Sequence, residues 1–154
     1  MTDLDDPYWQ ENDHRARIAK SFLNMKKAAG SGGNPDQWEE HALDLVSCCH
    51  QYPYVDFISI LPHWLPVAQE ASLGIRIELL TYLVQFMCTN KILKANTFDP
   101  IEFLKSTQDL LLANFSNATT EDQSAFLLCG LAITQQHFEV AGLLHEHLRQ
   151  KGCC

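Results

Sequence analysis

Cysteine and histidine are the side chains of this sequence with the most obvious chemical use, because both ligate metals and both serve in nucleophilic catalysis. The six cysteines are Cys48, Cys49, Cys88, Cys129, Cys153 and Cys154. Zinc sites usually take pairs of ligands that a short turn directs at one ion. Four of the six cysteines instead form adjacent doublets, whose side chains point in different directions on a helix. We therefore predict no metal site.

Other combinations that resemble catalytic or nucleotide-binding motifs are incomplete. His50 follows a cysteine doublet, but Cys49 falls on the apolar stripe of a predicted helix, whereas an activated thiolate needs an exposed, electropositive setting. His145 and His147 are about 200° apart on a helix and cannot chelate one ion together. The run "GSGG" at residues 30–33 lacks the Lys-Ser/Thr pair of a phosphate-binding loop. We predict no catalytic residue and no cofactor, and hence no enzyme.

The sequence ends in "KGCC", with Cys153 and Cys154 as the last two residues. This doublet resembles the prenylation tail of Rab-type small GTPases, although those proteins carry a phosphate-binding loop that this sequence lacks. Palmitoylation is the other lipid modification that such cysteines undergo. Cys153 and Cys154 are therefore candidate lipidation sites, and a membrane-anchored adaptor is one alternative for the function.

The composition is that of an acidic globular protein. The 154 residues are 46% hydrophobic and 19% charged, which suits one domain with a substantial core. Nineteen acidic and 11 basic residues give a net charge of −8, which argues against nucleic-acid binding because phosphate contacts depend on clustered Lys and Arg. No secretory signal precedes the domain, and the apolar runs are too short to cross a bilayer. We expect a soluble intracellular protein, cytoplasmic or nuclear.

Helix caps and apolar spacing predict an all-α fold of six or seven helices without a sheet. A first helix is expected over residues 7–29, with Asp6 as its cap, and a second begins at Pro35. Prolines at positions 53, 62 and 66 predict that the next segment is broken into short turns. Three further helices are expected to begin near Pro100, Thr120 and His137, and Gly152 ends the last.

The segment from 72 to 93 is apolar on nearly every side, which is typical of a helix at the centre of a core. Its predicted core residues are Leu73, Ile77, Leu80, Val84 and Met87. The side chains expected to pack on them are Trp38, Leu45, Leu111, Phe115, Leu127 and Leu131.

Predicted helix starts near 35 and 72, and again near 100 and 137, are 37 residues apart, which is the length of a paired-helix repeat. Residues 128–141 resemble one hairpin of the tetratricopeptide family, with Leu128, a small Cys129, and then Phe138, Glu139 and Ala141. The family's tryptophan is missing and no second copy is evident. The resemblance implies antiparallel helix pairs, stacked with tetratricopeptide or HEAT character, and a compact helical bundle is the alternative.

The glycine-serine run at 30–33 separates the first helix from the rest of the chain. We expect residues 1–29 to form a helical arm, 30–34 a flexible linker and 35–154 a helical domain. The run is typical either of a natural surface loop or of an engineered joint that fuses a partner's peptide to the domain. The apolar residues Ile18, Phe22 and Met25 are the candidates for docking this arm on the domain or on a second copy.

These features together favour a non-catalytic interaction module, a scaffold or adaptor that holds a helix or peptide of a partner protein in a groove between helices. Homo-oligomerisation through the arm is a further possibility, whereas neither nucleic acid nor membrane is expected as a partner unless the terminal cysteines are lipidated. The alternative from another class is a regulatory bundle that binds a hydrophobic small molecule in a cavity.

Overall fold

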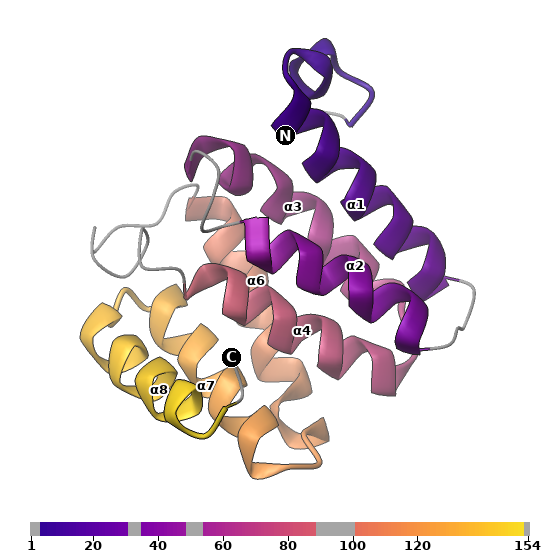
Figure 1. Cartoon of the computed structure of the whole chain (residues 1–154). Helices are drawn as coiled ribbons and strands as arrows, with labels where there is room; N and C mark the ends of the chain where they lie inside the picture. Colours follow the sequence, from indigo (N-terminus) through magenta and orange to yellow (C-terminus); the bar gives the residue numbers. More distant parts are fainter. Residues whose placement is uncertain (1–3, 31–34, 49–53, 89–100, 153–154) are drawn as a thin grey trace. The chain divides into compact units, whose positions relative to one another are not determined.

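A computed structural model of the chain describes residues 4–30, 35–48, 54–88 and 101–152. Over these ranges the regular elements are seven α-helices and two short 3-10 segments, so the predicted all-α class and the pairing of helices are confirmed (Figure 1). The chain divides into two compact units, residues 1–75 and residues 76–154.

The first unit begins with two separate helical segments where the sequence predicted one. Asp6 caps the 3-10 segment η1 (Pro7–Gln10), since its side chain accepts a hydrogen bond of 2.9 Å from the backbone N–H of Tyr8. Asn12 then starts α1 (Asp13–Gly30) by accepting a hydrogen bond of 3.0 Å from the N–H of Arg15. The prediction of a single helix over 7–29 was wrong because a second capping side chain lies inside it.

Helix α3 (Tyr54–Glu70) is continuous, although its prolines predicted separate short turns. Pro62 and Pro66 are four residues apart and therefore lie on the same face of the helix. That face is the less buried one, whereas Ile60, Leu61 and Trp64 on the opposite side are fully buried. Burial of the apolar face offsets the cost of the backbone hydrogen bonds that the two prolines remove from the helix.

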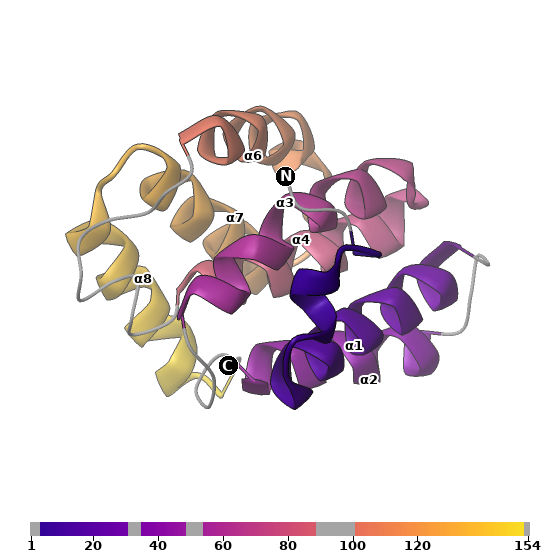
Figure 2. The same ribbon diagram turned by 90° about the horizontal axis from the view of Figure 1, so that it is seen from above.

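Helix α1 lies beside α2 (Pro35–Cys48) and also contacts α3, as Figures 1 and 2 both show for the pair α1 and α2. The ring of Phe22 lies 6.3 Å from that of Trp64 on α3, measured between centroids. Helix α1 is therefore a packed member of the first unit. The two compact units meet at residue 75. The expected arm, linker and domain stay a prediction, since residues 31–34 of the linker lie outside the described residues.

The second unit contains most of α4 (Leu73–Met87), followed by α6 (Ile101–Asn114), η2 (Phe115–Asn117), α7 (Glu121–Thr134) and α8 (Phe138–Gln150). Helix α4 is buried on nearly every side, as its composition predicted. The buried residues of this helix are Ile77, Leu79, Leu80, Tyr82, Leu83, Val84, Phe86 and Met87.

Most of the predicted core residues are buried, but three are not. Trp38, Leu45, Leu111 and Leu127 are buried. The expected packing of Trp38 and Leu45 on α4 stays a prediction, because these two residues belong to the first unit. Leu73 is 51% exposed because it is the first residue of α4, where the helix leaves the packed region. Phe115 and Leu131 are only half-buried. The predicted cap Asp99 and first residue Pro100 of α6 lie outside the described residues.

Helices α7 and α8 form a hairpin whose ends match the sequence prediction (Figures 1 and 2). Thr120 caps α7 by accepting a hydrogen bond of 3.1 Å from the N–H of Gln123, whose side chain in turn accepts one of 2.8 Å from Thr119 N–H. The turn before α8 holds Gln136 at a positive φ of 61°. Gly152 ends the hairpin at a φ of 78°, a conformation that favours glycine.

Candidate protein-binding surface

The candidate docking residues of the first helix lie inside the first unit. Ile18, Phe22 and Met25 are fully buried on α1, which contacts both α2 and α3. These side chains are buried and therefore not available to a partner. An accessible surface for a partner must therefore be sought elsewhere in the chain.

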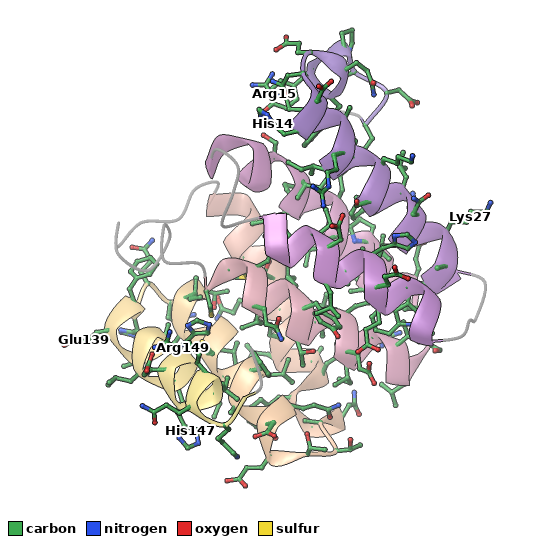
Figure 3. All side chains as sticks on the ribbon, viewed as in Figure 1. His14, Arg15, Lys27, Glu139, His147 and Arg149 are labelled. Carbon is green, nitrogen blue, oxygen red and sulfur yellow. The ribbon has the colours of Figure 1, made fainter. Side chains whose placement is uncertain are left out.

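The cysteine and histidine motifs considered in the sequence lie partly outside the described residues. Cys49, Cys153 and Cys154 lie outside the described residues. His145 is half-buried and His147 exposed on α8, where Figure 3 labels the latter. Across the described ranges, no group of three or more His, Cys, Asp or Glu side chains is arranged to hold a metal ion. In that same part of the chain, no helix has both the length and the apolar character needed to cross a membrane.

One basic side chain of α1 forms a polar contact with α2 inside the first unit. Arg17 donates a hydrogen bond of 2.7 Å to Asp44 on α2, and the Ser21 hydroxyl donates one of 2.6 Å to the other carboxylate oxygen. Burial raises the pKa of Asp44, but the hydrogen bonds from Ser21 and Arg17 outweigh it, so the pKa is lowered from its usual value. These polar contacts join α1 to α2 alongside the apolar packing.

The outer side of α8 carries the most exposed large apolar side chain described. Leu143 is 70% exposed and Val140 is 51% exposed, although both are large aliphatic residues. Val140, Leu143 and His147 are spaced by three and four residues, so they lie on one side of the helix. We call the set Glu139, Val140, Leu143 and His147 the α8 face.

Helix α8 packs in the second unit by the side opposite to the α8 face. Phe138, Ala141 and Leu148 are buried and hold the helix in the second unit. Val140 and Leu143 fall outside that buried stripe. Val140 and Leu143 were not among the predicted site residues, although two aliphatic residues away from the inward stripe of an amphipathic helix can indicate a binding surface.

The charges around the α8 face are unevenly neutralised. Arg149 forms an ion pair of 3.0 Å with Glu146, and its hydrogen bonds lower the pKa of the Glu146 carboxyl. Lys151 pairs with Asp122 of α7 at 2.8 Å. Within the described residues no ion pair is found for Glu139, which is exposed beside Val140. Figure 3 labels Glu139, His147 and Arg149 along α8. The cations are thus paired internally, and one acidic charge remains at the start of the face.

A shallow depression adjoins this acidic end. It has a volume of about 430 Å³ and is lined by the five consecutive residues from Gln136 to Val140. A second depression, in the first unit, has a volume of about 180 Å³ and includes Lys26 of α1 and Glu70 of α3 in its lining. Neither depression is lined by carbon alone. Both therefore differ from the closed apolar cavities that hold hydrophobic small molecules.

Comparisons with protein-family models, with curated proteins and with solved structures found no match to this chain.

Proposed function

We propose that the chain is a non-catalytic protein-interaction module whose α8 face binds an amphipathic helix of a partner protein. The apolar side of that helix would cover Val140 and Leu143. A basic side chain of the partner would lie against Glu139. The exposure of Leu143 is the observation that carries this proposal.

Physical chemistry supports a protein as the occupant. Covering an exposed leucine or valine contributes roughly 1.5–3 kcal/mol for each side chain, before the cost of ordering the partner. Helix-in-groove recognition uses anchors at spacings of three and four residues, which are the spacings of Val140, Leu143 and His147. The net charge of −8 and the unpaired position of Glu139 favour a partner that is basic near its apolar anchors.

The alternative function, binding of a hydrophobic small molecule, has less support. It calls for a cavity lined by apolar side chains near α4, yet the side chains of α4 are largely packed. The two depressions described above lie at the surface and include charged or polar residues in their linings. An anchored adaptor stays a prediction as well, because Cys153 and Cys154 lie outside the described residues.

The test compares proteins captured by the wild-type chain with those captured by Leu143→Ser. Leu43→Ser is the matched control, since Leu43 is also an exposed leucine on a helix, but in the first unit. We expect at least one protein that is retained by the wild type and by Leu43→Ser and is lost with Leu143→Ser. A purified helix from that protein should then bind Leu143→Ser about tenfold or more weakly in calorimetry, which corresponds to about 1.4 kcal/mol.

The effect of Glu139→Gln and the comparison of the two leucine variants test the proposal further. Glu139→Gln should weaken binding less than Leu143→Ser and should reduce the dependence of affinity on salt, because exposed charge pairs are screened by ions. If Leu143→Ser and Leu43→Ser capture the same proteins with the same affinity as the wild type, the α8 face is not the binding surface.

A further inference from the structure

Two cysteines that are far apart in the sequence meet in the core of the second unit. The Sγ atoms of Cys88, directly after α4, and Cys129, in the middle of α7, are 3.1 Å apart. Ordinary non-bonded contacts between carbon atoms are about 3.5–4.0 Å, whereas a disulfide bond is about 2.05 Å long. The two sulfurs are therefore in closer contact than packing requires and need to approach by only about 1 Å to bond.

A further hydrogen bond holds the Cys129 thiol in place. The thiol donates to the carbonyl oxygen of Ala141 on α8, with an Sγ–O distance of 3.3 Å. In the contact between the two sulfurs, either atom can be the donor. Both side chains are free thiols and both are buried.

We propose that Cys88 and Cys129 are an oxidation site at which a hydroperoxide closes an intramolecular disulfide. This inference does not depend on the function proposed for the α8 face. It concerns two thiols for which the sequence predicted no role.

The reaction consumes one hydroperoxide for each pair. One thiolate attacks the peroxide, the O–O bond breaks, and a sulfenic acid forms while the departing oxygen takes up a proton. The second thiol then attacks the sulfenic sulfur, so that the S–S bond forms, the S–O bond breaks and water leaves. With hydrogen peroxide, two thiols lose two electrons and two hydrogens, and the peroxide is reduced to two molecules of water.

Burial makes this a slow and selective site. Peroxide reaches buried thiols only when the structure opens locally, so the pair should oxidise more slowly than an exposed cysteine. Once closed, the disulfide links the end of α4 to the middle of α7. It thereby encloses the segment between Cys88 and Cys129, which includes all of α6.

The experiment treats the purified full chain with hydrogen peroxide, blocks the remaining thiols with an alkylating reagent under denaturing conditions, and maps the peptides without reduction. We expect a linked Cys88–Cys129 peptide that dithiothreitol cleaves, and a rise in Tm of roughly 5–15 °C for the oxidised chain, because the closed loop is long. Cys129→Ala should abolish both changes. The double variant Cys153→Ala and Cys154→Ala is the control that should retain them.

Peptide mapping of the wild-type chain decides the matter even if a variant fails to fold. The proposal is overturned if Cys88 and Cys129 are both recovered alkylated after oxidation of the other cysteines. It is equally overturned if Cys88 or Cys129 is found linked mainly to a different cysteine.

Discussion

At the scale of single residues, Gly130 shows how close the helices of the second unit approach. A Cβ atom at this position would lie 2.6 Å from Cγ2 of Val84 and 2.9 Å from Cδ1 of Leu111. Both distances are too short for real contacts, so a larger residue requires the side chains of Val84 and Leu111, or the helices that carry them, to shift. This glycine lies inside a helix, where glycine normally lowers helix stability by about 1 kcal/mol relative to alanine.

We predict that Gly130→Ala destabilises the chain by about 1–2 kcal/mol, since overpacking of roughly 1–3 kcal/mol exceeds the gain in helix propensity. Gly142→Ala on α8 is the matched control, because nothing lies within 4 Å of a Cβ placed there. It should stabilise the chain by about 0.5–1 kcal/mol. Urea unfolding of both variants measures the difference. Equal stabilisation by both substitutions would show that α7 packs less tightly than described.

Asp44 is the residue whose charge should make the stability of the first unit depend on pH. Its pKa is lowered in the folded chain, because hydrogen bonds from Ser21 and Arg17 outweigh the effect of burial, which raises it. As pH falls below its usual value of 3.8, the unfolded chain therefore takes up the proton first. The contribution of Asp44 is present above that pH and is lost as pH falls through the folded pKa.

We predict that Asp44→Asn lowers the free energy of unfolding by about 1 kcal/mol near neutral pH, a modest value because the pair is partly exposed. The difference from the wild type should shrink as pH is lowered below about 4. Ser21→Ala, which removes one donor and keeps the charge, should show a smaller effect. A difference that stays constant between about pH 7 and pH 3 would mean that Asp44 titrates normally in the folded chain.

At the scale of elements, α1 packs against its unit by one face and exposes the other face to solvent. Phe22 is buried against α3, while its neighbour Leu23 points outward and is 45% exposed. The polar contacts of Arg17 and Ser21 with Asp44 join the same helix to α2. The helix thus depends on its unit for stability, because an isolated helix of this length is marginal in water.

We predict that Phe22→Ala costs about 3–5 kcal/mol, as for other large-to-small changes in a core, whereas Leu23→Ala costs under about 1 kcal/mol. Hydrogen exchange supplies an independent reading. Amides of residues 15–27 should be protected in the wild type and should exchange faster in Phe22→Ala. Exchange at the rate of an unfolded peptide in the wild type would show that α1 is a free arm.

At the scale of the whole chain, the negative charge is shared unequally between the two units. Residues 1–75 hold eleven acidic and five basic side chains, for a net charge of −6, and residues 76–154 hold eight and six, for −2. Within the first unit, Arg17 of α1 forms an ion pair with Asp44 of α2. The second unit is the less charged of the two and carries the exposed α8 face.

Much of the helical framework followed from local chemistry in the sequence. Capping by Asp6 and Thr120, the first position of Pro35, and the end at Gly152 were all predicted from residue types, because caps and positive-φ glycines act over only a few residues. The all-round apolar pattern of α4 likewise predicted its burial. Local rules failed at Asn12, which divides the first helix, and at the prolines of α3.

The open face and the thiol pair depended on long-range packing. Phe138, Ala141 and Leu148 are the buried residues of α8, and only the packed hairpin shows that Val140 and Leu143 are left uncovered. Cys88 and Cys129 are 41 positions apart, and nothing in either local sequence states that their sulfurs meet at 3.1 Å.

The sequence by itself thus determined the class of fold, most helix ends and the apolar character of the central helix. The reason is that hydrogen-bonded caps and helical periodicity are local properties of a chain. Tertiary structure alone decided which apolar side chains remain exposed, how closely α7 approaches α4 and α6 at Gly130, and which thiols are neighbours. These features arise from the positions of segments that are distant along the chain, which packing sets and local sequence does not encode.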